Sequence, residues 1–207
     1  RDKNGVMRMQ LNGKDIFEFG PLDQGWWPDG LYTAPSYEAM VYDIKKTKEW
    51  GFNMIRKHIK VEPATWYNYC DKEGIIVWQD MPSGDYGKSQ PWKYNDAFYG
   101  GDKSNRSAES EETYYKEWKD IIDNFRSYPC ISVWVPFNEA WGQFKTDEVV
   151  KWTQKYDPYH LINPASGGNF SMEGDILDLH HYPEPKSFLF DARKVNAIGE
   201  FGGIGFP

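Results

Sequence analysis

The stretch ISVWVPFNEAWGQF, residues 131–144, begins as a buried strand and ends in polar residues. Its first part is apolar except for one serine and rich in β-branched side chains, which is typical of a strand inside a parallel sheet. Asn138 and Glu139 follow where the apolar run ends, and Trp141 comes after them. A glutamate is destabilising when it is buried without a partner. The stretch therefore predicts a core strand that delivers Glu139 to a functional site.

Apolar runs and amphipathic segments alternate along all 207 residues, which predicts one α/β domain spanning residues 1–207. The apolar runs are continuous rather than interrupted at every second residue, as expected for parallel strands covered on both faces. We predict strands near Ile16, Asn53, Ile75, Ser132, Leu161, Ile176 and Ala197. Helices are predicted at residues 36–50, 63–74, 110–127 and 146–156.

The positions of the polar residues discriminate between two α/β architectures. No glycine-rich phosphate-binding motif follows a predicted strand, so a doubly wound nucleotide-binding sheet loses most of its support. Polar side chains instead collect where strands end, as they do at the active face of a (β/α)8 barrel. We therefore predict a (β/α)8 TIM barrel that is truncated after strand seven, in a fragment of a longer enzyme. The strand-end residues are Arg56, His58, Gln79, Asp80, Asn138, Glu139, Asn163, His180, His181 and Glu200.

Composition limits the classes of partner. Acidic residues outnumber basic ones by 31 to 24, and the net charge of −7 argues against nucleic acid or an anionic membrane surface. No apolar run reaches the roughly 18 residues that span a bilayer, so membrane insertion is not expected. Aromatic residues make up 17% of the chain, and aromatic rings suit the apolar faces of sugars. Cys70 and Cys130 lie in apolar surroundings, and we interpret them as buried free thiols.

Two glutamates in corresponding positions point to glycosidic bond cleavage. Glu139 in FNEAWG and Glu200 in IGEFGG each follow an apolar strand. Glycoside hydrolysis needs one carboxyl group that protonates the leaving oxygen and one that attacks or activates water. Desolvation at a strand end is expected to raise the pKa of such a glutamate toward the range of a general acid. The competing interpretation places both glutamates in ordinary surface loops.

The segments GFNMIRKH, WYNYCDKEGIIVWQDMP, RSYPCISVWVPFNEAWG and NAIGEFGG resemble the catalytic barrel of glycoside hydrolase family 2, which includes β-galactosidases, β-mannosidases and β-glucuronidases. The resemblance implies a retaining double displacement without a cofactor. Glu139 would end strand four as the acid/base, and Glu200 would end strand seven as the nucleophile. The substrate would be an oligosaccharide or a polysaccharide-derived glycoside. The resemblance also implies β-sandwich domains in the same longer chain and favours a periplasmic or extracellular location, although the polar N-terminus carries no export signal.

The resemblance also assigns supporting residues. Asn138 would hydrogen-bond the sugar 2-hydroxyl, Arg56 would brace the nucleophile, and Tyr182 would donate a hydrogen bond to it. A structural ion pair is the alternative for Arg56. His58 departs from the family pattern, in which a histidine stands where Ile59 stands here, and we keep His58 as a candidate sugar contact.

His181 is a further candidate substrate contact, and Trp141 is expected either to form the floor of a sugar subsite or to pack in the core. No metal is predicted, because His180 and His181 are adjacent on a strand and point to opposite faces. Two other functions stay open: a non-catalytic carbohydrate-binding barrel, and a metal-dependent hydrolase that uses Asp80, His58 and the histidine pair. The sugar is predicted to be β-galactose, with β-mannose and β-glucuronate as alternatives. The long loop after strand three is a predicted leaving-group subsite through Trp92, Tyr94, Phe98 and Tyr99.

Overall fold

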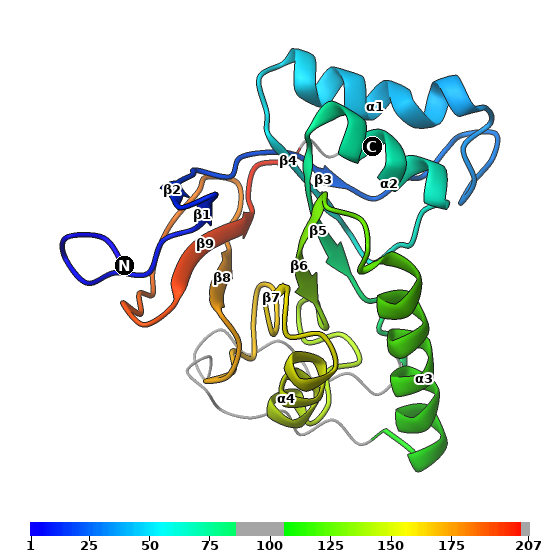
Figure 1. Cartoon of the computed structure of the whole chain (residues 1–207). Helices are drawn as coiled ribbons and strands as arrows, with labels where there is room; N and C mark the ends of the chain where they lie inside the picture. The colour runs from blue at the N-terminus through cyan, green and yellow to red at the C-terminus, as the bar shows by residue number, and fades with distance from the viewer. Residues whose placement is uncertain (86–105, 204–207) are drawn as a thin grey trace.

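The computed structural model of the protein describes residues 1–85 and 106–203. Its strands form a five-stranded sheet in the order β3-β4-β5-β6-β7 and an adjoining parallel pair, β8-β9 (Figure 1). All neighbours in these two sheets are parallel and follow chain order, as in a TIM barrel. The strands are β3 (Leu22–Asp23), β4 (Met54–Lys57), β5 (Ile76–Asp80), β6 (Ile131–Val135), β7 (Leu161–Ile162), β8 (Ile176–His180) and β9 (Val195–Glu200). A small antiparallel hairpin, β1 (Gln10–Leu11) and β2 (Lys14–Asp15), precedes them.

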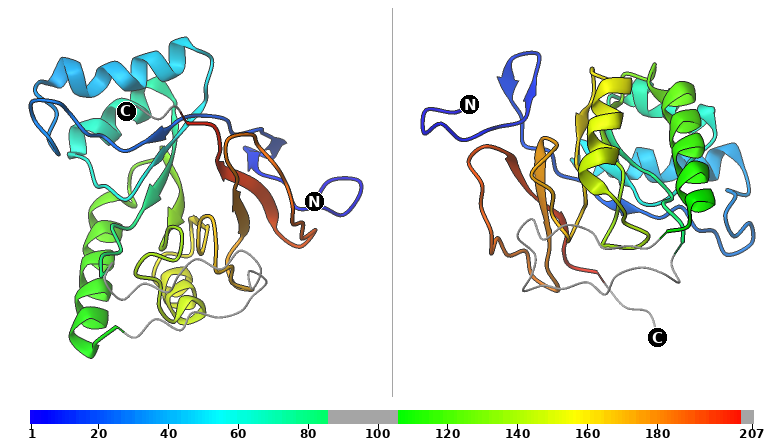
Figure 2. Two further views of the ribbon diagram at one scale, coloured as in Figure 1. Left: turned by 180° about the vertical axis from the view of Figure 1, so that it is seen from behind. Right: turned by 90° about the horizontal axis from the view of Figure 1, so that it is seen from below.

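Four helices lie outside the five-stranded sheet, and the second view of Figure 2 shows no helix in the described chain outside β8 and β9. The side chain of Ser36 accepts a hydrogen bond from the Ala39 amide and so starts the first helix. Gly74 ends the second helix in the left-handed conformation, with φ 67°. The predicted helices are confirmed as α1 (Tyr37–Glu49), α2 (Ala64–Glu73), α3 (Ala108–Phe125) and α4 (Thr146–Tyr156).

The predicted first strand is wrong in its position. Apolar residues before Pro21 predicted a buried strand there, but Phe17 is 83% exposed and Phe19 is 46% exposed. The strand ladder forms after Pro21, where Leu22 pairs with Arg56 of β4. The position of this strand is set by its pairing with β4 and not by a local apolar run, because the strand contains only two residues. The other six predicted strands each overlap an observed one.

The barrel interior changes from apolar to polar along the strands, and this change positions the site. Successive residues of a strand point to opposite faces, so Met54 and Arg56 of β4 share the inner face, as do Trp78 and Asp80 of β5. Met54 and Trp78 belong to an interior cluster, whereas Arg56 and Asp80 lie one step closer to the carboxyl ends of their strands. The apolar interior cluster is built from Met9, Met54, Trp78, Val133, Val135 and Ile176.

A larger core lies between the helices and the outer face of the five-stranded sheet. Trp66 of α2, Trp118 of α3 and Trp134 of β6 are among its fully buried members. Trp118 and Trp134 meet edge to face with centroids 5.5 Å apart. This packing fixes the outer face of β6, the strand that leads to Asn138 and Glu139.

None of the described helices is both long enough and apolar enough to cross a membrane. Cys70 and Cys130 are buried and not bonded to each other, which confirms the prediction of free thiols. The loop aromatics of the predicted leaving-group subsite, Trp92, Tyr94, Phe98 and Tyr99, lie outside the described residues.

Candidate active site

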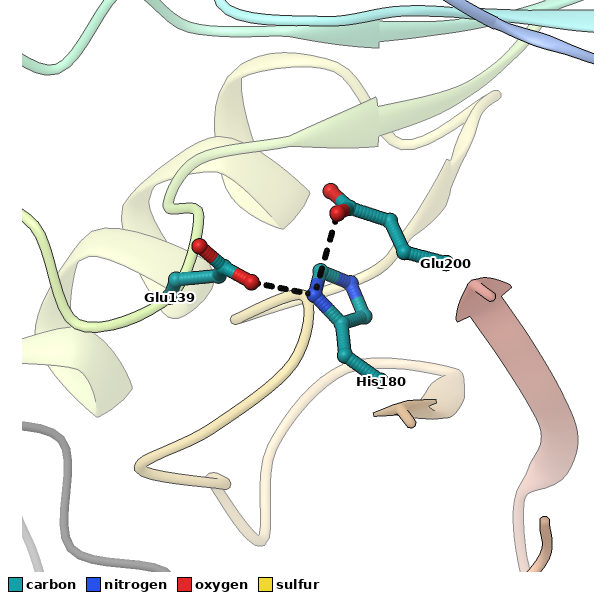
Figure 3. Close-up of side chains that lie close together, drawn as sticks. All are labelled: Glu139, His180 and Glu200. Carbon is teal, nitrogen blue, oxygen red and sulfur yellow. Dashed lines mark hydrogen bonds and ion pairs between the residues drawn. The ribbon is translucent and has the colours of Figure 1, made fainter. Parts of the chain in front are cut away.

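The candidate active site lies where four strands end, and Figure 3 shows its centre. Arg56 comes from β4, Glu139 from the turn after β6, His180 from β8 and Glu200 from β9. The imidazole of His180 stands between the two carboxylates, with Nδ1 2.9 Å from Glu139 Oε1 and 3.6 Å from Glu200 Oε2 (Figure 3). Glu139 and Glu200 are more than sixty positions apart in the sequence, and the parallel strands bring them together.

The two carboxylates are close enough to act on one bond. An oxygen of Glu139 and an oxygen of Glu200 lie within 4.8 Å of each other. Retaining glycosidases place their carboxyl groups roughly 5–5.5 Å apart, whereas inverting enzymes leave roughly 6.5–9.5 Å for a water molecule. The separation in this site therefore fits the retaining geometry, with direct attack by one carboxylate, better than the inverting geometry.

A left-handed turn aims Glu139 at the site. The φ angles of Glu139 and Ala140 are 49° and 67°, a region that residues with a Cβ rarely adopt. The Glu139 amide donates to the Ser166 carbonyl at 2.7 Å, and Asn138 forms an isolated bridge with Ser166. The loop after β7 thus holds the strained turn after β6 in place.

Both oxygens of Glu200 accept hydrogen bonds. Arg56 Nη1 donates to Oε1 at 2.8 Å, and the Tyr182 hydroxyl donates to Oε2. His58 Nε2 lies 3.7 Å from Oε1. Burial, followed by the nearby charge of Arg56, lowers the pKa of His58 to about 4, so its ring is neutral at neutral pH. Glu200 itself is 7% exposed, and its orientation is set from three directions.

Arg56 connects the two halves of the site. It donates to Asp80 through Nε at 3.1 Å and Nη2 at 2.8 Å, and Nη2 also donates to Asn138 Oδ1 at 2.7 Å. Burial opposes its positive charge, but the carboxylates of Asp80 and Glu200 outweigh this effect and raise the pKa of Arg56. Because the Asn138 oxygen is occupied by Arg56, the amide of Asn138 presents its NH₂ group as a donor.

The expected pKa shift of Glu139 is wrong in direction. Desolvation was expected to raise the pKa, but the hydrogen bond with His180 outweighs desolvation and lowers the pKa of Glu139. His180 was not predicted as the partner of this carboxylate, although the strand pattern contains the signal. Asp178 and His180 alternate on one face of β8, and His180 pairs in register with Glu200.

His180, and not His181, reaches the centre of the site. The His181 ring contacts the backbone oxygen of Glu184 through Nδ1 at 2.6 Å, and the structure places it outside the carboxylate pair. Trp141 is 44% exposed, so it does not pack in the core, and its role as the floor of a sugar subsite stays a prediction. The structure brings together five of the predicted site residues, with His58 beside them: Arg56, Asn138, Glu139, Tyr182 and Glu200.

Within the described residues, Glu139, His180 and Glu200 have ligand atoms close enough to surround a cation. Arg56 and Tyr182 already donate to the two oxygens of Glu200, so positive charge and hydrogen-bond donors occupy the space that a cation would need. The metal-dependent hydrolase considered from the sequence would need Asp80 as a metal ligand, but both carboxylate oxygens of Asp80 face Arg56. We therefore assign no metal to this site.

Comparison with known proteins identifies the family of the chain. The family model described as "Glycosyl hydrolases family 2, TIM barrel domain" matches residues 8–186. The chain belongs to glycoside hydrolase family 2. The match confirms the predicted family and barrel fold, and it ends before β9, so it does not include Glu200.

Curated relatives of this chain are named β-galactosidase. It is 28% identical over 170 residues to the β-galactosidases of Yersinia pestis bv. Antiqua (strain Angola) and Yersinia pseudotuberculosis serotype O:1b (strain IP 31758). Each alignment covers 82% of this chain and 15% of the relative. The chain therefore spans about a sixth of the length of these relatives.

Solved structures of the family share its fold. A β-glucuronidase of Dictyoglomus thermophilum superposes with a TM-score of 0.69 at 16% identity, covering 86% of this chain and 32% of that chain. A family 2 β-galacturonidase of Eisenbergiella tayi bound to galacturonate superposes with a TM-score of 0.66 at 19% identity, covering 86% and 31%. At these identities the likeness concerns the barrel fold.

Proposed function

We propose that the protein is the catalytic barrel of a retaining β-glycosidase, with Glu139 as acid/base and Glu200 as nucleophile. The observation that carries the proposal is the pair of carboxylates within 4.8 Å of each other, held by different partners. Glu200 is held by Arg56 and Tyr182, whereas Glu139 is held by His180. Two carboxyl groups in different surroundings are what separate acid and nucleophile roles require.

In the first step, Glu200 attacks the anomeric carbon while Glu139 protonates the glycosidic oxygen. The bond between the anomeric carbon and that oxygen breaks, its electron pair goes to the oxygen, and a covalent glycosyl ester forms on Glu200. The hydrogen bonds from Arg56 and Tyr182 orient the attacking carboxylate. The NH₂ group of Asn138 is available to donate to the sugar 2-hydroxyl.

In the second step, Glu139 is ionised and removes a proton from water. The water oxygen attacks the anomeric carbon, the ester bond breaks, and its electron pair returns to Glu200. The product has the configuration of the substrate because the anomeric carbon is inverted twice. The lowered pKa of Glu139 favours the ionised form that this step needs.

The proposed substrate is a terminal β-galactoside of an oligosaccharide or polysaccharide fragment. The names of the curated relatives support β-galactose, while β-mannose and β-glucuronate are the alternatives. The exposed ring of Trp141 is a candidate platform for a sugar face, and His58 a candidate contact. Other domains of the same longer chain are the proposed partners of the barrel. A panel of nitrophenyl β-glycosides, assayed with the full-length protein, tests the choice of sugar.

Azide rescue tests the two glutamate roles separately. Glu200→Gly is expected to lose activity and to regain it with azide on an activated substrate, giving an α-glycosyl azide because only one inversion occurs. Glu139→Gly is the matched variant, and azide should give a β-glycosyl azide because the ester on Glu200 still forms. NMR of the first sugar released by the wild-type protein provides the decisive control: an inverted product would refute the double displacement.

A further inference from the structure

A series of side chains leads from the buried interior to Glu139. Asp178 Oδ2 lies 2.6 Å from Ser166 Oγ, which lies 2.7 Å from His180 Nε2, and His180 Nδ1 lies 2.9 Å from Glu139 Oε1. Asp178 and Ser166 are fully buried, and His180 is 2% exposed. Three consecutive short contacts, shielded from water as far as His180, form a continuous hydrogen-bonded path to the proposed acid/base, whose side chain is 31% exposed.

The chemistry of the buried end fixes the direction of the hydrogen bonds. Asp178 Oδ2 accepts a hydrogen bond from Asn163 Nδ2 at 2.7 Å and another from the Ser166 hydroxyl. Ser166 therefore donates its hydroxyl proton to Asp178. The Ser166 oxygen is then free to accept, so the proton between Ser166 and His180 is on His180 Nε2.

Arg56 also contacts this nitrogen. Its Nη1 lies 3.4 Å from His180 Nε2, and a guanidinium can only donate. That contact would require Nε2 without a proton, whereas the contact with Ser166 at 2.7 Å requires a proton on Nε2. The shorter contact is the stronger one, and Arg56 Nη1 already donates to Glu200 at 2.8 Å.

We infer that Asp178, Ser166 and His180 form a relay that keeps His180 protonated at Nε2 and presents Nδ1 as the proton partner of Glu139. The inference rests on the proposed function and adds a positioning residue to it. A neutral His180 accepts the proton of the carboxylic acid, and a protonated His180 donates from Nδ1 to the carboxylate. Glu139 and His180 therefore share one proton. The hydrogen bond from Nδ1 that lowers the pKa of Glu139 holds this proton on His180, and it moves to the carboxyl group for leaving-group departure.

Two glycines leave the space that the relay occupies. A Cβ on Gly167 would lie 2.3 Å from His180 Nδ1, and a Cβ on Gly199 would lie 2.3 Å from both oxygens of Asp178. Real Cβ atoms do not approach other heavy atoms this closely. At these two glycines the chain therefore contacts the relay through backbone alone, which lets it pack directly against His180 and Asp178.

The relay keeps His180 beside Glu139 through both proposed catalytic steps. When Glu139 gives its proton to the glycosidic oxygen, it keeps the electron pair of the O–H bond and becomes a carboxylate beside His180. The same imidazole then receives no new bond and stays in place for the second step. The groups around this pair are Arg56 of β4, His58 after β4, Asp178 of β8, Tyr182 after β8 and Glu200 of β9.

Nitrogen and carbon NMR test the relay without relying on activity. In protein labelled with [15N]histidine, His180 is expected to show a protonated Nε2. Ser166→Ala removes the acceptor of that proton, so the spectrum should change to a mixture of tautomers. In protein labelled with carboxyl-13C glutamate, His180→Gln should raise the pKa of Glu139, because the hydrogen bond that lowers it is lost. Ser132→Ala, on β6 and outside the relay, should change neither measurement.

The kinetic readout uses the pH profile of kcat/KM. Protonated Glu139 is needed for the first step, so its alkaline limb should move to higher pH in His180→Gln. The rate on substrates with poor leaving groups should fall about 10–100-fold in Ser166→Ala, a part of the 10²–10⁴-fold that acid–base catalysis supplies. Nitrophenyl substrates should be affected less, because they need less protonation.

Separate outcomes identify which idea fails. A wild-type His180 protonated only at Nδ1, or an Ser166→Ala spectrum identical to wild type, would overturn the relay even if azide rescue succeeds. A confirmed Nε2 proton together with failed azide rescue would uphold the relay and refute the proposed function. If Asp178→Asn does not fold, Ser166→Ala and His180→Gln still give both results.

Discussion

Replacing Arg56 with methionine tests whether one buried cation holds the site together. The guanidinium is 2% exposed and donates to the carboxylates of Asp80 and Glu200, which are themselves 0% and 7% exposed. Methionine fills a similar volume but leaves two buried carboxylates without their cation. Removing one partner of a buried ion pair typically destabilises a protein by about 3–5 kcal/mol, which exceeds the contribution of most single contacts.

The destabilisation by Arg56→Met should depend on pH. Burial raises the pKa of Asp80, and Arg56 counteracts this shift. Arg56→Met should therefore raise that pKa further. A carboxyl group with a raised folded-state pKa binds more protons in the folded than in the unfolded protein, so stability falls as pH rises above the ordinary value near 4. The destabilisation by Arg56→Met should be larger at pH 8 than at pH 5.

Urea unfolding followed by tryptophan fluorescence measures both effects. Lys151→Met is the control, because it removes an exposed ion pair in which Nζ lies 3.1 Å from Glu173, and it should cost at most about 1 kcal/mol. The double variant Arg56→Met/Asp80→Leu should recover part of the loss, since replacing a whole buried pair by apolar groups is often neutral. A loss below about 1 kcal/mol in Arg56→Met, or one that does not depend on pH, would refute the reasoning.

Other positions give independent tests. Ile122→Ala should destabilise the protein by about 2–5 kcal/mol, because the Ile122 side chain on α3 is fully buried in the larger core. An unchanged urea midpoint would contradict this packing. Ser36→Ala should cost about 0.5–2 kcal/mol through loss of the cap on α1, whereas Ser36→Asp should retain most of the stability in the same assay. Cys70 and Cys130 should resist iodoacetamide in the folded protein and react after unfolding, because both are buried. The hydrogen bond of the Cys130 thiol with Cys70, followed by burial, also raises the pKa of Cys130. Alkylation of the native protein seen by mass spectrometry would argue against this.

Local signals predicted the helices because local interactions set their ends. Ser36 caps α1 through its own side chain, and Gly74 ends α2 through a backbone conformation that suits glycine. The first strand could not be predicted in the same way. Its ladder contains Leu22 and Asp23 only, and their pairing with β4 depends on a segment more than thirty residues away.

Site residues could be predicted where a polar residue follows an apolar strand. Their hydrogen-bond partners could not, because these depend on which strand face points inward. Glu139, Glu200 and Arg56 follow that pattern, and the structure brings them together. The choice between His180 and His181 depends on which face of β8 points inward, and the direction of the Glu139 pKa shift depends on that choice. Neither can be obtained from composition or spacing alone, because adjacent residues of a strand differ only in face.

The left-handed turn at Glu139 has an evolutionary consequence. At φ 49°, a side chain with a Cβ is destabilising by about 1–2 kcal/mol relative to glycine, which adopts this region freely. Selection for folding alone would therefore favour glycine or asparagine at this position. If Glu139 is retained for the proposed acid/base role, relatives of this barrel that lack the reaction should lose glutamate here more often than at Glu200, whose strand conformation carries no such penalty.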